Sequence, residues 1–227
     1  MKRKFHVRCE AGENLEITSK SYLSLSDLAD LGTVMGNVYH TKEEMIDCVN
    51  VFYEGMVQRS EEMKQHPNYK TGENYAYLGL PPCFLIFDEY VAFFEMLGTK
   101  ESVGLLSQLK KIVMLGRQAG YFLIVACQRP DAKYFSDGIR DNFNFRVGLG
   151  RISELGYGML FGSDVKKQFF QKRIKGRGYC DVGTSVISEF YTPLVPKGHD
   201  FLQTIGSLAQ ARQDGTATCE AKGDGTD

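Results

Sequence analysis

The sequence lacks several features that would assign a class at once. Among its 227 residues no apolar run approaches the roughly 20 residues that a membrane-spanning helix needs. Its basic start, MKRKFHVRCE, is not followed by the apolar segment of a signal peptide. The six cysteines include no C-x-x-C pair of the kind that zinc sites use. We therefore expect a cytoplasmic protein with reduced thiols, neither secreted nor membrane-spanning.

Two further absences concern ligands. The formal net charge is only −1, so no overall positive field indicates nucleic-acid binding, and any DNA contact must be local or shared across an assembly. The phosphate-binding motif G-x-x-x-x-G-K-[ST] does not occur, and the sequence contains no Gly-Lys dipeptide. Without those backbone amides and that lysine, the binding of a nucleoside triphosphate by the chain alone should be severely weakened.

What is present is typical of a globular protein. Hydrophobic residues make up 43% and charged residues 24% of the chain, which is long enough for one large domain. We divide it into an atypical amino-terminal segment, 1–21, with weak strand signals at 5–9 and 15–18, and a folded domain, 22–205. The remainder, 206–227, is rich in Gly, Ala, Thr, Asp and Gln, and we expect it to be disordered.

The order of the elements predicts an α/β fold. Thr41 and Glu44 form a capping box that begins a helix, and this helix should end before Pro67. An apolar strand, 83–87, is followed by an amphipathic helix, 100–119, and a second apolar strand, 121–127, which indicates a βαβ unit of a parallel sheet. The residues expected to form the buried face of the 100–119 helix are Val103, Leu106, Leu109, Ile112, Val113 and Leu115. Downstream we predict a helix at 134–140, a third strand at 143–149, a helix at 153–162 and a final hairpin within 176–195.

Polar side chains follow both apolar strands. Asp88 and Glu89 end the first strand, at the edge where open α/β sheets bind ligands. In a nucleotide-hydrolysing site the first acid holds Mg²⁺ and the second orients or deprotonates the attacking water. Gln128 ends the next strand and can align a water or sense the γ-phosphate. The alternative is that these residues are only solvated polar groups at the ends of strands.

Five arginines are candidates for the finger that a ring-shaped ATPase places against a neighbouring active site: Arg117, Arg129, Arg140, Arg146 and Arg151. Sequence alone does not choose among them, although Arg117 also suits the carboxyl end of its helix. Arg146 is a candidate catalytic residue because a charge within an otherwise apolar strand needs a partner or an interface. The basic run VKKQFFQKRIKGRG either contacts phosphates or is a solvated face.

The segments FLIFDEYVAFF and LLSQLKKIVMLGRQAGYFLIVACQRPDAKYFSDGIRDNFNFRVGLG resemble the Walker B, helix and sensor-strand regions of FtsK/SpoIIIE-type DNA translocases. The resemblance covers about residues 22–200 and is nearest to the ATPases of conjugative transposons. It implies a RecA-like P-loop NTPase core, a mainly parallel sheet with flanking helices, here without its amino-terminal Walker A unit. It also implies ATP and Mg²⁺ as cofactors, with Asp88 as the Mg²⁺ ligand, Glu89 as the catalytic base and Gln128 as the sensor.

The function that this resemblance implies is ATP-dependent DNA translocation, with DNA, sister subunits of a hexameric ring, and a relaxase or transfer-channel proteins as partners. Attachment to a membrane would come only through a further amino-terminal region. The alternative is a catalytically inactive fragment that associates with full-length motor subunits, which the missing Gly-Lys dipeptide favours. A recombinase or packaging ATPase is a third possibility, and the Gln-Arg-Pro strand end argues against it.

Overall fold

A computed structural model of the chain describes residues 38–128, 130, 133–135, 137–150, 152–162, 165, 176–184, 186–193 and 195–213. The strands expected at 5–9 and 15–18, Arg129, Arg151 and most of the basic run lie outside the described residues. No helix within these ranges is both long enough and apolar enough to cross a membrane. The domain boundaries at residues 21 and 205 stay predictions.

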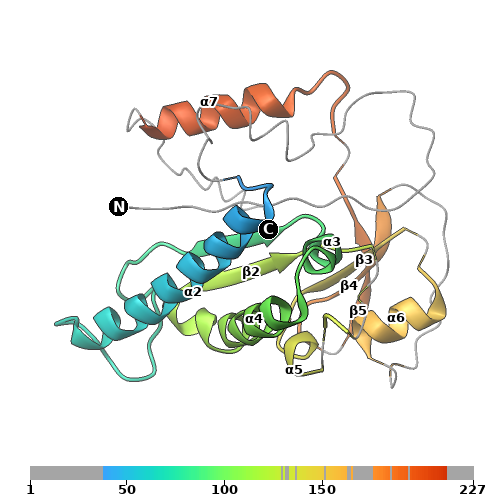
Figure 1. The fold of residues 1–227 in the computed structure, drawn as a ribbon. Helices are drawn as coiled ribbons and strands as arrows, with labels where there is room; N and C mark the ends of the chain where they lie inside the picture. The colour runs from blue at the N-terminus through green and yellow to red at the C-terminus, as the bar shows by residue number, and fades with distance from the viewer. Residues whose placement is uncertain are drawn as a thin grey trace.

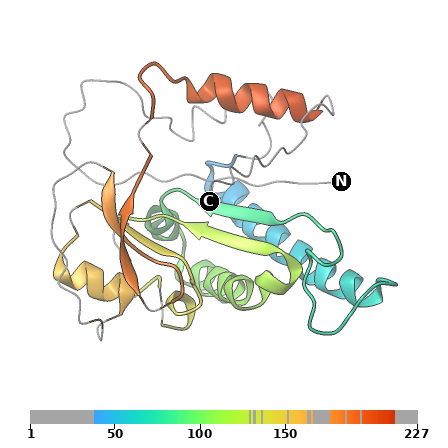
Figure 2. The same cartoon turned by 180° about the vertical axis from the view of Figure 1, so that it is seen from behind.

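The predicted βαβ unit is confirmed. Strands β1 (Cys83–Phe87) and β2 (Tyr121–Val125) pair in parallel, with Cys83 opposite Tyr121 and Phe87 opposite Val125. Helices α2 (Lys42–Gln65) and α4 (Thr99–Ala119) cover one face of this sheet, and the view from behind shows the strands in front of both helices (Figures 1 and 2). The short helix α3 (Tyr90–Glu95) begins directly after the acids that follow β1.

Helix α2 begins and ends where the sequence predicts. The Thr41 side chain accepts a hydrogen bond from the Glu44 backbone, and the Glu44 carboxylate accepts one from the Thr41 backbone, so both partners of the capping box are made. Its inner face packs on the sheet through Cys48, Val49, Phe52, Met56 and Met63, all buried.

Helix α4 corrects one expectation. It ends at Gly120, whose φ of 76° requires the left-handed region that glycine adopts without strain. Its buried residues are Leu105, Leu109, Ile112, Gly116 and Ala119. Val103 and Leu115, expected to be buried, are 65% and 60% exposed. They are apolar residues on the outer sides of the helix, out of phase with the face that meets the sheet.

A second, separate sheet follows. Strands β3 (Arg146–Leu149), β4 (Arg177–Asp181) and β5 (Ile187–Tyr191) pair antiparallel in the order β3-β4-β5. The predicted hairpin is therefore confirmed, but the expectation of a mainly parallel sheet holds only for β1 and β2 among the described strands. The pairing of β3 with β4 places Arg146 opposite Asp181, which gives the charge on this strand a partner. Helix α6 (Glu154–Phe161) packs against this sheet.

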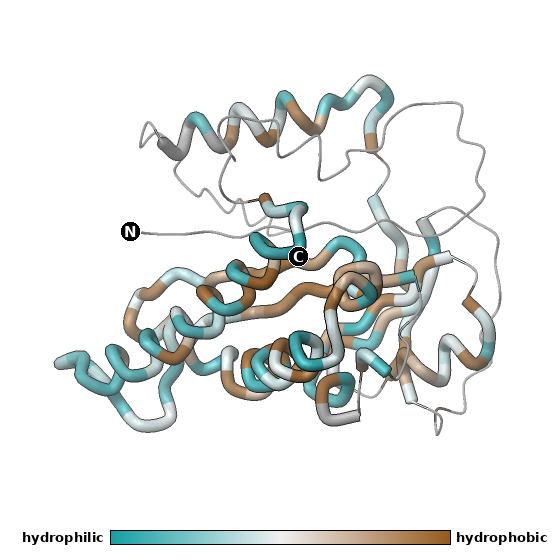
Figure 3. Tube along the Cα trace, in the orientation of Figure 1, coloured by the Kyte–Doolittle hydropathy of each residue, from teal (hydrophilic) through white to brown (hydrophobic). Residues whose placement is uncertain are grey.

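The apolar side chains of the described residues form two cores. The larger one lies between the β1-β2 sheet, α2, α3 and α4, and Figure 3 shows apolar residues along β1 and β2. The smaller one, Tyr157, Phe161, Tyr179 and Ile187, lies between α6 and the second sheet.

Two helices differ from the sequence prediction. Helix α5 (Asp137–Arg140) is shorter than the expected 134–140, because residues 133–135 form a turn. Helix α7 (Phe201–Gln213) includes residues 206–213, which we expected to belong to a disordered tail. The Asp200 side chain accepts a hydrogen bond from the Gln203 backbone and caps this helix, and its Leu, Ala, Gln and Arg residues are good helix formers.

Candidate functional site

The two acids lie where the strand passes into a helix. Asp88 and Glu89 directly follow β1, and Glu89 is the residue before the first turn of α3. Both residues are half-buried, and the Asp88 Oδ1 atom is shielded from solvent. The backbone carbonyl of Glu89 accepts a hydrogen bond from the Phe93 N–H at 3.3 Å, so the start of α3 fixes the backbone of the acid pair.

Gln128 lies at the same edge of the sheet. It is exposed and follows β2 by three residues. Parallel pairing puts the carboxyl ends of β1 and β2 side by side, and two backbone bonds continue this pairing beyond the strands. Ala126 N–H donates to the Phe87 carbonyl at 2.9 Å, and Tyr90 N–H donates to the Ala126 carbonyl at 3.0 Å. The structure therefore brings Asp88, Glu89 and Gln128 to one edge, as their places in the sequence predict.

Arg146 is not part of that edge. It lies in the second sheet, where its Nη2 atom is 2.7 Å from Asp181 Oδ2 and its Nη1 donates to the Leu160 carbonyl at 3.2 Å. The Arg146 and Asp181 side chains are 19% and 6% exposed. The expected partner of this charge therefore comes from the same chain, and the geometry favours a structural role.

Two more of the five candidate arginines, Arg117 and Arg140, are described, and each has a structural explanation. Arg117 is exposed in the last turn of α4, where its charge favours the helix carboxyl end. The Arg140 side chain donates to the Met159 carbonyl at 3.5 Å, and this contact ties α5 to α6.

The acid pair suits a divalent metal only if other ligands, such as phosphate and water, complete the coordination shell. No cluster of three or more Asp, Glu, His or Cys side chains exists in the described part of the chain, so a site made entirely of protein ligands is not found there. Mg²⁺ at phosphoryl-transfer sites commonly takes one or two carboxylates and completes its shell with phosphates and water. The Asp88 and Glu89 oxygens are donors of this type. They would hold the ion together with a phosphate ligand.

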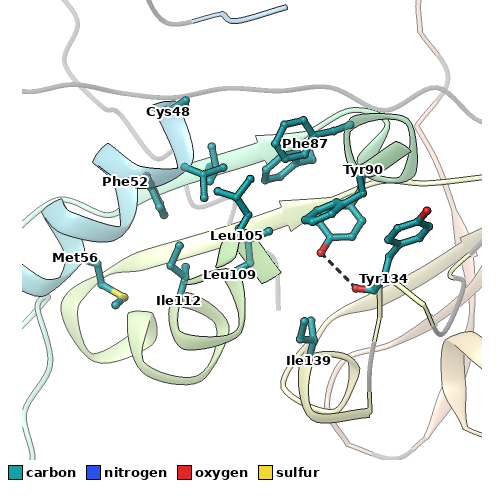
Figure 4. Close-up of a cluster of buried hydrophobic side chains, with 14 of the residues drawn as sticks. Cys48, Phe52, Met56, Phe87, Tyr90, Leu105, Leu109, Ile112, Tyr134 and Ile139 are labelled. Atoms are coloured by element: carbon teal, nitrogen blue, oxygen red, sulfur yellow. Dashed lines mark hydrogen bonds between the residues drawn. The ribbon is translucent and has the colours of Figure 1, made fainter. Parts of the chain in front are cut away.

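An aromatic cluster beneath the acids was missed by the sequence analysis. The buried Tyr90 ring packs on Phe87, Phe94 and Phe135, with centroid distances of 5.5, 4.7 and 4.6 Å. Figure 4 shows Tyr90 with Phe87 and Tyr134. The Tyr90 hydroxyl donates a hydrogen bond to the Tyr134 carbonyl at 3.4 Å, and burial raises the pKa of this hydroxyl. The feature of the sequence that could have revealed this cluster is the tyrosine directly after the two acids, Tyr90.

A second contact joins the same segments. Lys133 Nζ lies 2.6 Å from the Tyr134 hydroxyl, which donates to a carboxylate oxygen of Glu95 at the end of α3. This hydrogen bond with Tyr134 raises the pKa of Lys133. The turn at 133–135 is therefore attached to both ends of α3, through Tyr90 and through Glu95. A shallow pocket of about 200 Å³ lies nearby between α4 and α5, and not at the acids.

Known proteins are similar to this chain in sequence and in fold. No family model matches the chain. The chain is 53% identical over 203 residues to the FtsK domain-containing protein YdcQ of Bacillus subtilis (strain 168). The match covers 89% of the chain and 42% of that relative, so the chain spans about two fifths of the relative's length.

Solved structures share the fold at low sequence identity. The cytoplasmic domain of the Thermomonospora curvata type VII secretion ATPase EccC matches 76% of the chain and 21% of its own, with 18% identity and a TM-score of 0.53. The pCW3 conjugation coupling protein TcpA, in its monomer form with ATPγS, matches 64% of the chain and 44% of its own, with 18% identity and a TM-score of 0.50. With the 53% identity to an FtsK domain-containing protein, the chain belongs to the FtsK-type family.

Proposed function

We propose that the chain forms part of an ATP-driven, DNA-translocating motor of the FtsK/SpoIIIE type that acts in conjugative DNA transfer. The observation that carries this proposal is the Asp88–Glu89 pair beside Gln128, at one edge of a parallel sheet, in a chain 53% identical to an FtsK domain-containing protein. TcpA, named as a conjugation coupling protein, has the same fold and supports the conjugative assignment.

The three residues divide the chemistry among them. Asp88 would hold Mg²⁺, which neutralises charge on the β and γ phosphates of ATP when it is bound. Glu89 would accept a proton from the attacking water, or orient it. The Gln128 amide can donate and accept hydrogen bonds, so it would position that water or respond to the γ-phosphate. Arg146 enters this scheme as a support of the second sheet, because its charge is already paired with Asp181.

The phosphates themselves need further residues. No Gly-Lys dipeptide occurs in these 227 residues, so we propose that the phosphate-binding loop comes from residues outside them. The motor would then work as an assembly of subunits, a hexameric ring by family resemblance, located in the cytoplasm. Its other partners would be DNA and a relaxase or transfer-channel proteins.

A second function is tested in the same experiment because no Gly-Lys dipeptide occurs in these residues. In this alternative the chain is a catalytically inactive fragment that joins full-length motor subunits and changes their activity. The same edge of acids would then lie in a mixed assembly that hydrolyses ATP more slowly.

The experiment measures Mg²⁺-dependent ATP binding and DNA-stimulated hydrolysis, first for the purified chain and then for the chain mixed with the Bacillus subtilis relative. In the mixture with the relative, we expect the Glu89→Gln chain to support ATP binding but to lose the hydrolysis that the wild-type chain adds, and the Asp88→Asn chain to lose the dependence of binding on Mg²⁺. Glu154→Gln, an exposed glutamate of α6, is the matched control and should change neither.

The outcomes separate the two functions. Hydrolysis that appears or rises with the wild-type chain and is lost with Glu89→Gln supports the motor. Inhibition of the relative that is equal for wild type, Asp88→Asn and Glu89→Gln supports the inactive fragment. Hydrolysis unaffected by either substitution would refute the assignment of these acids.

A further inference from the structure

Helices α2 and α4 present opposite charges on their outer sides. Both helices cover the same face of the β1-β2 sheet, so their outer sides face solvent in the same direction (Figure 1). On α2 the exposed residues opposite the buried face include four acids: Glu43, Asp47, Glu54 and Glu61. On α4 the exposed residues include four bases: Lys100, Lys110, Lys111 and Arg117. Lys110 also lines the pocket between α4 and α5, and Lys111 Nζ lies 3.4 Å from the Tyr53 hydroxyl of α2.

The two helices run in the same general direction, and two contacts set their register. Lys42 and Glu101 form an ion pair of 2.8 Å at their beginnings. Near their ends the Arg59 guanidinium donates to the Ala119 carbonyl at 3.3 Å. A residue of α2 therefore lies level with the α4 residue whose number is about 59 higher.

This register decides how a second copy fits. A two-fold axis that lies in the contact plane, parallel to both helices, places α2 of one copy over α4 of its partner without any shift along the helices. Glu54 then lies level with a position within about three residues, or about 5 Å, of Lys110 of the partner subunit. The same holds for Glu43 with the partner's Lys100, and for Glu61 with the partner's Arg117. An axis across the helices would instead place α2 on α2, where like charges repel.

The size of the face is sufficient for a weak, specific contact. The charged residues extend over about 27 Å of helix at about 1.5 Å per residue, and two helices about 10 Å apart present a face about 20 Å wide. Such a face would bury about 1,100 Å² in total, just above the roughly 1,000 Å² expected of a biological interface. It also contains exposed apolar side chains of α4, Val103 and Met114, that the contact would cover.

We propose that the outer face of α2 and α4 is a self-complementary surface that pairs two copies of the chain about a two-fold axis, through in-register contacts between acids of α2 and bases of α4. This contact goes beyond the proposed motor function. Subunits of a ring meet head to tail through two different surfaces, whereas this surface meets itself and stops at two copies.

The test is a charge swap at one pair in the middle of the helices. Sedimentation equilibrium of the full chain at 50 and 500 mM NaCl should show a monomer–dimer equilibrium that weakens with salt. Glu54→Lys and Lys110→Glu should each raise the dimer dissociation constant by about tenfold, because each change acts at two symmetry-related contacts. The chain that carries both substitutions should return to within about threefold of wild type. Lys197→Glu, an exposed lysine elsewhere, is the control and should leave the constant unchanged.

Three results would overturn the proposal. The first is a wild-type chain that stays monomeric at 50 mM NaCl up to millimolar concentration. The second is a double variant that is as weak as the two single variants. The third is association that continues beyond two copies with the same charge dependence, which would show a head-to-tail contact. None of these results depends on ATP binding, so this proposal and the motor function fail separately.

Discussion

Replacing Asp181 by asparagine tests whether Arg146 is a structural residue. Asparagine has the shape of aspartate and can still accept the hydrogen bond that Gly183 N–H donates to Oδ1 at 2.9 Å. It removes the negative charge that lies 2.7 Å from the Arg146 guanidinium. The substitution therefore removes one half of a mostly buried ion pair and leaves the arginine in place.

The expected loss follows from burial. Removing one partner of a buried pair costs about 3–5 kcal/mol when the remaining charge is fully desolvated. The Arg146 side chain is 19% exposed and also contacts the Leu160 carbonyl, so we expect about 2–3 kcal/mol. With a urea m-value of about 2 kcal/mol/M, the unfolding midpoint should fall by about 1–1.5 M.

Urea unfolding of wild type, Asp181→Asn, Arg146→Met and the double variant measures this pair. The double-mutant cycle should give a coupling free energy of about 1.5 kcal/mol or more, because the methionine removes the charge that asparagine leaves unpaired. A coupling below about 0.5 kcal/mol would refute the structural role. Arg146 would then be free to act elsewhere, as the sequence analysis proposed.

Two further predictions concern the larger core. Gly116→Ala should destabilise the chain by about 1–3 kcal/mol, since its Cβ would meet the Tyr121 carbonyl oxygen. Gly104→Ala, in the same helix with nothing within 4 Å, should stabilise it by about 0.5–1 kcal/mol, and thermal melts showing the reverse order would contradict the packing of α4 on β2. Burial raises the pKa of Cys48 and of Tyr121 to about 12 each, from ordinary values of 9.0 and 10.0. Between about pH 9 and 12 the folded chain therefore keeps protons that the unfolded chain loses. The free energy of unfolding should have its full value below about pH 9 and should fall as the pH rises from 9 to 12. Urea melts across this range should show the fall, a smaller one in Cys48→Ala, and a constant free energy up to pH 11 would contradict the burial of these groups.

The first sheet and its edge could be predicted because their signals are local. The continuous apolar run of β1, the helical period before Gly120 and the second apolar run fix a βαβ unit. Once the strands are parallel, Asp88 and Gln128 must lie at one edge. The Thr41 capping box likewise depends on residues three positions apart.

The rest depended on distant partners. The four residues of β3 do not reveal that their neighbour is β4, about 30 residues later in the chain, so the sequence did not indicate antiparallel pairing or the bond to Asp181. Val103 and Leu115 are apolar like the buried residues of α4, and only the position of the sheet distinguishes them. The contact of Tyr90 with Tyr134 joins residues 44 positions apart, and no periodicity marks it.

The contact of Tyr90 with Tyr134 also joins two segments at the edge of the sheet. The backbone of Glu89 enters α3, and both ends of α3 are attached to the turn that follows Gln128. We therefore expect the two segments to gain or lose order together, so that a ligand that immobilises the acids also removes conformational entropy from the turn. The cost of ordering both segments is met once, so a second ligand that binds beside the turn would bind more tightly to a chain that already holds the first.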